Sequence, residues 1–120
     1  SRVNVPRPVA RVGLRLNARR GDVVVRIDPA RVTRFYAADK YVLCRLDGVE
    51  YVLDESLNEL EKLLDAELFM RVHRAELVNL SRVRAVSMGD EGMLLELDDG
   101  ERARAARRTV TELKQRLGIR

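Results

Sequence analysis

Residues 69–83 contain the side chains best suited to binding a charged ligand. This stretch begins with a period of two, which places Arg71 and His73 on one side of an expected strand. The period stops at Ala75, so a turn or a short helical piece must begin there. An arginine beside such a turn, as Arg74 is, can donate two hydrogen bonds to the O6 and N7 atoms of guanine. Residue types that commonly hold phosphate follow it: Asn79, Ser81 and Arg82. Contact with nucleic acid and an ordinary solvated basic loop both fit this pattern.

Catalysis finds little support elsewhere in the sequence. The Gly-rich phosphate-binding, zinc-protease and serine-hydrolase motifs are absent. The single histidine, His73, lies between Arg71 and Arg74, which disfavour its protonated form, and no nucleophile accompanies it. We interpret His73 as a structural residue and Cys44, in an apolar-rich segment, as a small core residue. One Cys and one His also exclude an internal disulfide and a His-rich zinc site. The domain is therefore predicted not to be an enzyme, and a hydrolase centred on His73 is the weakest hypothesis.

Charge is unevenly distributed along the 120 residues. The 23 Lys and Arg residues against 19 Asp and Glu residues give a formal charge of +4, which suits an anionic partner. Residues 54–67 are acidic, with Lys62 their one cation, and residues 102–120 are basic, with Glu112 their one anion. We expect one face that repels phosphates and another that attracts them, unless both are ordinary solvated helix faces.

Length and composition predict one soluble domain. The 46% of apolar residues supply a core, and no apolar run approaches the roughly 20 residues that span a bilayer. With no secretory signal in the sequence, we predict a cytoplasmic domain that makes no membrane contact. Residues 1–11 hold Pro6 and Pro8 among arginines and are predicted to be the end of an interdomain linker. Residues 12–120 are then the folded domain.

Short apolar runs separated by turn residues predict a mainly β fold. Residues 14–19 and 23–27 form one expected hairpin, and residues 32–46 and 49–53 form a second around Asp47-Gly48. Residues 83–106 are predicted to be a three-stranded meander. Two helices are expected after capping boxes that begin at Ser56 and Thr109, and Gly118 should end the second helix.

The motif over residues 69–83 resembles the signature of LytTR DNA-binding domains, the output domains of many bacterial response regulators. The matching residues are Phe69-Met70-Arg71-Val72-His73-Arg74, then Leu77-Val78-Asn79 and a strand at Val83. Residues 35–42, the helix segment at 56–61 and Ala106-Arg107-Arg108 before the last helix resemble further family segments. The resemblance covers about residues 12–118. It implies a mainly β fold of about ten short strands in stacked small sheets, with two short amphipathic helices.

The resemblance also implies which residues bind DNA. Loops enter successive major grooves, and the base-reading positions correspond to Lys40, Arg74 and Arg108, all of which can donate to guanine. Ala106 stands where the family usually has serine, so a hydroxyl that could hold a phosphate or cap the turn is missing. The residues then expected to contact phosphate are Asn79, Arg82, Arg107 and Thr109. His73 is expected to be hydrogen-bonded beneath its loop.

The function implied by the resemblance is sequence-specific binding of double-stranded DNA by the C-terminal effector domain of a bacterial transcription regulator. The operator is expected to carry paired direct repeats, on which two copies bind, while the domain alone is monomeric. The upstream partner is a receiver or sensor domain, and no cofactor or metal is expected. The alternative is a protein-interaction module of the same fold that does not bind DNA.

Overall fold

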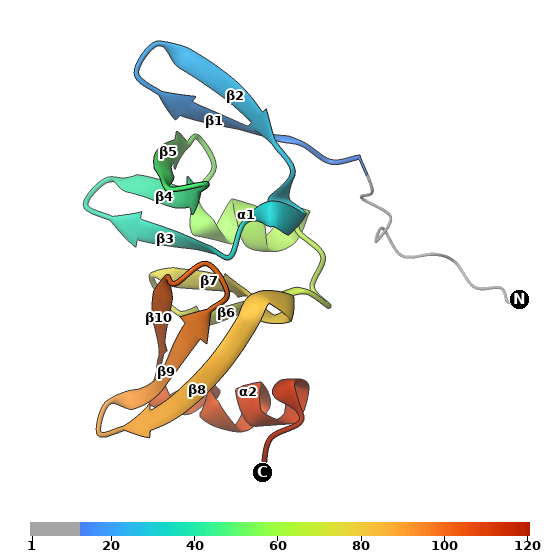
Figure 1. The fold of residues 1–120 in the computed structure, drawn as a ribbon, viewed down its shortest axis with the longest axis vertical. Helices are drawn as coiled ribbons and strands as arrows, with labels where there is room; N and C mark the ends of the chain where they lie inside the picture. The colour runs from blue at the N-terminus through green and yellow to red at the C-terminus, as the bar shows by residue number, and fades with distance from the viewer. Residues whose placement is uncertain (1–12) are drawn as a thin grey trace, which may run out of the picture.

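The computed structural model describes residues 13–120, which form two antiparallel sheets and two short helices (Figure 1). The expected linker at residues 1–11 lies outside the described residues. None of the helices formed by residues 13–120 is long and apolar enough to cross a membrane.

The larger sheet has seven strands in the order β2-β1-β5-β4-β3-β7-β6. Its strands are β1 (Leu16–Arg20), β2 (Val23–Ile27), β3 (Arg34–Ala38), β4 (Tyr41–Leu46), β5 (Val49–Leu53), β6 (Phe69–His73) and β7 (Glu76–Asn79). The smaller sheet is the predicted meander, in the order β10-β9-β8: β8 (Val83–Gly89), β9 (Gly92–Leu97) and β10 (Arg102–Ala105). The fold class expected from the sequence is confirmed.

The predicted turn at Asp47-Gly48 joins β4 to β5. Both residues have positive φ angles, of 54° and 79°, and Leu46 pairs with Val49 across the turn. Such two-residue turns match the twist of the strands they join. Residues 32–46 are divided into β3 and β4 by a turn at Asp39 and Lys40, where Asp39 has a φ of 56°, so Lys40 lies in the loop that the resemblance implies.

The two helices differ in how their first turns are held. Helix α1 (Leu57–Leu63) has the predicted capping box, in which Ser56 Oγ accepts from the Glu59 amide and the Glu59 carboxylate accepts from the Ser56 amide. Helix α2 (Val110–Leu117) ends at Gly118 with a left-handed φ of 72°, as predicted. The capping box expected at Thr109 is wrong, because the Thr109 hydroxyl donates to backbone carbonyls outside the helix.

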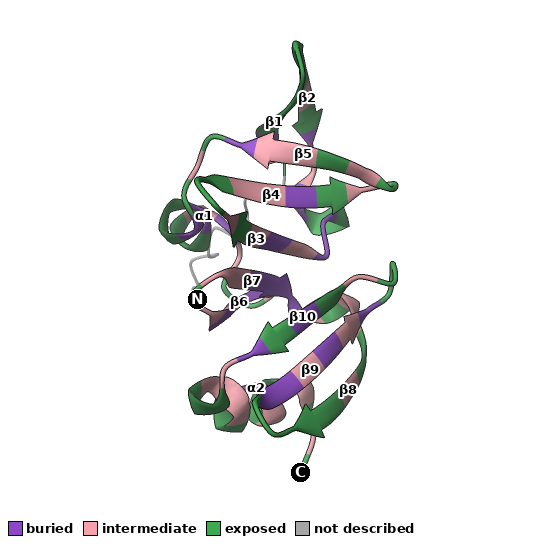
Figure 2. Ribbon diagram, turned by 90° about the vertical axis from the view of Figure 1, so that its left-hand side faces the viewer, coloured by how far each residue is buried: buried purple, intermediate pink, exposed green. Residues whose placement is uncertain are grey.

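The β6–β7 hairpin separates two hydrophobic cores. Phe69 and Leu77 face the first core, under the larger sheet and α1, while Met70 and Val72 face the second core, with the smaller sheet and α2. Figure 2 shows the hairpin between the upper and lower parts of the molecule. Alternate side chains of a strand point to opposite faces, so one hairpin supplies both cores. This places the end of β6 between the two halves of the molecule.

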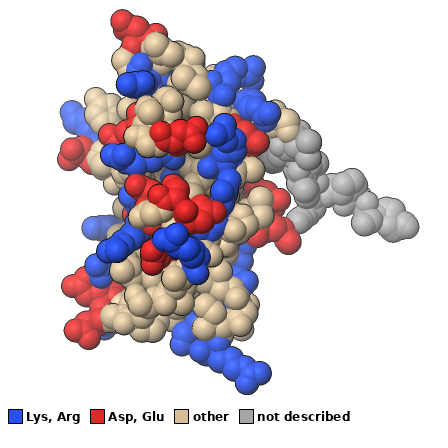
Figure 3. All heavy atoms as spheres, viewed as in Figure 1, with Lys and Arg blue, Asp and Glu red and all other residues tan. Residues whose placement is uncertain are grey.

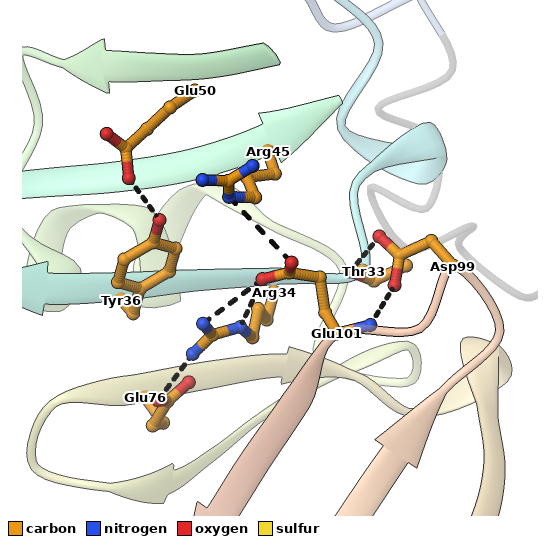
Figure 4. A network of polar contacts seen from close by, with 8 residues as sticks. All are labelled: Thr33, Arg34, Tyr36, Arg45, Glu50, Glu76, Asp99 and Glu101. Carbon is orange, nitrogen blue, oxygen red and sulfur yellow. Dashed lines mark hydrogen bonds and ion pairs between the residues drawn. The ribbon is translucent and has the colours of Figure 1, made fainter. Parts of the chain in front are cut away.

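A polar network also joins the two sheets (Figure 4). Arg34 on β3 donates to Glu76 on β7 at 2.7 Å and to Glu101, in the β9–β10 connection, at 3.2 Å. Thr33 donates to Asp99 in the same connection at 3.0 Å. Burial raises the pKa of Glu76, while the nearby Arg34 guanidinium partly opposes this shift. The network therefore fixes the β9–β10 connection against the larger sheet.

Cys44 is fully buried on β4, as its assignment to the core requires. Burial raises the pKa of its thiol to about 12, so the reactive thiolate is scarce at neutral pH. We expect a thiol reagent to leave the native protein unmodified at pH 8 and to modify the denatured protein within minutes. Labelling followed by mass spectrometry measures both states. Rapid labelling of the native protein would contradict the core assignment.

Candidate nucleic-acid interface

Three cationic side chains lie on turns at one side of the molecule. Lys40 is in the β3–β4 turn, Arg74 is in the β6–β7 turn, and Arg108 is in the 3₁₀ turn η4 (Arg107–Thr109) between β10 and α2. Figure 2 views this side and shows these connections one below another along the long axis. Within residues 13–120, all three side chains are exposed and none has an intramolecular hydrogen bond or ion pair.

Lys40 and Arg74 line the same shallow hollow. The hollow has a volume of about 260 Å³ and also includes Tyr41, Asn58 from α1 and Arg71 from β6. Strand β3, which leads into the Lys40 turn, is bonded directly to the Arg74 turn, because the Ala37 amide donates to the Ala75 carbonyl at 3.0 Å. Two loops that the sequence separates by more than thirty residues therefore share one surface.

The Arg74 turn follows an irregularity in β6. The register with β7 shifts between Arg71 and His73, which leaves Val72 outside the regular ladder. His73 Nδ1 accepts from the Ala75 amide at 3.1 Å, so the predicted hydrogen bond beneath the turn is present. A bulge of this kind redirects the residues that follow it.

The Val72 carbonyl freed by this bulge anchors η4. It accepts from the Ala106 amide at 2.8 Å and from the Thr109 hydroxyl at 3.2 Å. The Thr109 hydroxyl also approaches the Ala106 carbonyl at 2.7 Å. Thr109 thus supplies a side-chain bond in a turn where Ala106 has no hydroxyl of its own. The anchor places Arg108 beside the end of the strand that leads to Arg74.

The four predicted phosphate contacts have different surroundings. Arg107 is exposed and donates to the Asp90 carbonyl, and Arg82 pairs with Asp98 at 3.2 Å. The Arg82–Asp98 ion pair is partly exposed, and a surface ion pair contributes only about 0–1 kcal/mol and is readily exchanged. The Arg107 hydrogen bond to a backbone carbonyl is also at the surface. These two arginines remain candidates for phosphate contact.

The structure corrects the expectation for Asn79. This residue is fully buried, and its amide donates to the Val32 carbonyl at 3.1 Å while its oxygen accepts from Ser81. It holds the 3₁₀ turn η3 (Leu80–Arg82) against the segment before β3 and is inaccessible to phosphate. The partly exposed Thr109 donates its hydroxyl to backbone carbonyls, so a phosphate contact from this hydroxyl would replace one of these bonds.

Arg71 is a residue whose contacts sequence reasoning missed. Its half-buried guanidinium donates to the carbonyls of His73 and Arg74 and to two side chains of α1. The available signal was its position three residues before Arg74, on the same side of the strand as His73. Acidic and basic side chains are interspersed on the face seen in Figure 3, so no patch of a single charge marks that face.

Comparison with known proteins identifies the family. The model of the LytTr DNA-binding domain family matches residues 22–118, which is most of the chain. The chain belongs to the LytTr DNA-binding domain family. The resemblance drawn from the sequence is confirmed, and the alternative of a module without DNA binding is not supported.

Relatives of this LytTr domain are transcription regulators. The heme-containing CO-sensing transcriptional regulator RcoM 2 of Paraburkholderia xenovorans is 31% identical over 98 residues, which are 80% of this chain and 37% of that protein. The CO-responsive transcriptional regulator RcoM of Rhodospirillum rubrum is 41% identical over 66 residues, 53% of this chain and 28% of that protein. The match thus spans only 37% of the length of the first relative and 28% of the length of the second.

A solved LytTr DNA-binding domain from Bacillus cereus has the same fold. It superimposes with a TM-score of 0.78 at 25% sequence identity, covering 88% of this chain and 97% of that one. The ten strands and two helices of the LytTr domain are therefore those of its family.

Proposed function

We propose that this LytTr domain binds double-stranded DNA sequence-specifically, as the effector domain of a bacterial transcription regulator in the cytoplasm. The observation that supports this most directly is the placement of Lys40, Arg74 and Arg108. They are exposed on three turns of one side, and no intramolecular contact of the described residues occupies them. Arg19 and Arg84, by contrast, are paired with carboxylates at 2.9 and 2.6 Å, although within residues 13–120 Arg20, Arg26 and Arg102 are exposed and unpaired like the three turn residues.

The chemistry of the three side chains supports a different role for each kind of cation. Arg74 and Arg108 carry planar guanidinium groups that can donate two parallel bonds to guanine in the major groove. Lys40 offers a single, more strongly hydrated charge and discriminates between bases less well. Arg82 and Arg107 can exchange their surface partners for phosphates, which fix the position of the protein on the duplex.

We infer that two copies bind paired direct repeats, and that the domain is monomeric without DNA. Half-sites on one side of the duplex are separated by whole helical turns, and we expect about two turns between them. An upstream receiver or sensor domain would then supply the signal. The relatives support a sensory partner, since they are named as CO-sensing and CO-responsive regulators and are much longer than this domain.

Base reading is tested with a duplex selected by the wild-type chain from a random pool. Arg74→Ala and Arg108→Ala should each weaken binding to that duplex by roughly 1–3 kcal/mol, and binding to a scrambled duplex by much less. Lys40→Ala should cost less than either arginine change. Isotherms on both duplexes at one salt concentration measure the discrimination.

The matched control for base reading is Arg84→Ala on β8, where an exposed arginine pairs with Glu96 away from the three turns. It should leave discrimination unchanged. Equal losses on selected and scrambled duplexes for Arg74→Ala and Arg108→Ala would limit both side chains to phosphate contact. Failure of the wild-type chain to bind any duplex at low salt would instead favour a protein partner.

A further inference from the structure

Arg71 has more polar contacts than a structural ion pair requires. Its Nε donates to the His73 carbonyl at 3.1 Å, and its Nη2 donates to the Arg74 carbonyl at 2.5 Å. Its Nη1 donates to Asn58 Oδ1 at 2.8 Å and to Glu61 Oε1 at 3.1 Å, both on α1. All three nitrogens of one guanidinium are used, and they join two consecutive turn carbonyls to a helix.

The bonds to the two carbonyls restrain the backbone of the Arg74 turn. The bulge at Val72 interrupts the ladder just before its last pair, His73 with Glu76, so the Arg74 backbone beyond that pair depends on other partners for its direction. Arg71 supplies partners for both carbonyls. The guanidinium is planar and its donors are fixed relative to one another, so it restricts the two carbonyls to one arrangement.

The helix contacts fix Arg71 itself. Asn58 and Glu61 lie one turn apart on α1, whose buried face is packed into the first core through Leu57 and Leu60. The Arg71 side chain is only 22% exposed, compared with 48% for Glu61. A rigid helix therefore holds the guanidinium, and the guanidinium holds the turn.

We propose that Arg71 is a positioning residue for DNA recognition, which sets the direction of Arg74 toward the base it reads and does not itself contact DNA. This inference rests on the proposed base-reading role of Arg74. A group in direct contact with a base must be held to within about 0.5 Å of its productive position, so loss of the Arg71 bonds should cost discrimination more than affinity. Lysine at position 71 retains the charge but lacks the fork of donors.

The test compares Arg71→Lys with wild type on the selected and scrambled duplexes. Affinity for the selected duplex should fall roughly 5- to 50-fold, as for loss of a bidentate base contact, and affinity for the scrambled duplex by less than about threefold. The slope of log K against log salt should not change, because no phosphate contact is lost. A slope that becomes shallower by about one would show that Arg71 touches phosphate and would overturn the proposal.

A double-mutant cycle separates positioning from general destabilisation. In the Arg74→Ala background, Arg71→Lys should have little further effect on the selected duplex, because the side chain it positions is already absent. Additive losses would overturn the proposal while leaving the DNA-binding function intact. If the wild-type chain shows no discrimination between duplexes, the proposed function fails first, and the two failures are thereby distinguished.

Hydrogen exchange tests the positioning role without DNA, and a second variant tests it without replacing Arg71. Hydrogen exchange of the Ala75 amide, which donates to His73 Nδ1, should accelerate in Arg71→Lys while amides in β9 remain protected. Asn58→Ala, which removes one helix contact and leaves both carbonyl contacts, should give the same changes to a smaller extent. Uniform acceleration over both sheets would assign Arg71 to overall stability and overturn the positioning role. Arg84→Lys, at an exposed pair on β8, is the matched control.

Discussion

Gly92→Ala should destabilise the domain by about 3–5 kcal/mol. Gly92 begins β9 with a φ of 126°, a backbone region that costs a residue with a Cβ of order 1–3 kcal/mol. A Cβ at this position would also lie 2.3 Å from the Ala105 carbonyl oxygen and 3.4 Å from the Arg107 amide nitrogen. Both neighbours are backbone atoms, so β10 itself would have to move. The clash adds to the conformational cost.

The displaced segment leads directly into η4, so Gly92→Ala should also weaken recognition by Arg108. Chemical denaturation measures the free energy of unfolding, and isotherms below the unfolding transition measure operator discrimination. Gly89→Ala is a close control, because it lies in the same hairpin and its Cβ would be 3.8 Å from the nearest atom, in ordinary contact. If Gly92→Ala lowers the free energy of unfolding no more than Gly89→Ala does, the close approach of β9 to β10 is contradicted.

Arg34→Met should destabilise the domain by about 2–3 kcal/mol. Arg34 and Glu76 are 16% and 17% exposed, and Arg34 is bonded to Glu101 as well (Figure 4). Breaking a fully buried pair costs roughly 3–5 kcal/mol because one charge remains uncompensated, and the partial exposure here reduces that cost. One oxygen of Glu76 is already buried without a hydrogen-bond partner in the described structure. Loss of Arg34 would leave this carboxylate without its cation.

The cost of the uncompensated Glu76 charge is isolated by comparing the free energy of unfolding of Arg34→Met with that of two further variants. Arg84→Met breaks an ion pair with 54% and 40% exposure and should cost less than about 1 kcal/mol. Adding Glu76→Gln to Arg34→Met should recover part of the lost stability, because the uncompensated charge is then removed. If Glu76→Gln makes Arg34→Met less stable still, charge desolvation is not the cause. Equal effects for Arg34→Met and Arg84→Met would refute the special role of the network.

Local signals explain why much of the fold can be predicted from the sequence. The Asp47-Gly48 turn, the Ser56 capping box and the Gly118 helix end all depend on contacts between residues a few positions apart. The alternation of Met93, Leu95 and Leu97 likewise appears as buried positions of β9. The family motif over residues 69–83 then indicates the remaining topology and the three loops, although it does not describe their contacts.

The sequence by itself therefore determined the fold class, the family and the three turns that carry Lys40, Arg74 and Arg108. Only the tertiary structure decided which partners the nearby polar side chains bond to. Asn79 finds its partner at Val32, and Arg71 finds its partners on α1. Residue type states how many hydrogen bonds a side chain can make, but not which distant segment will supply them. Burial then selects among the possible partners, because a polar group removed from water must bond to whatever backbone the fold brings within reach.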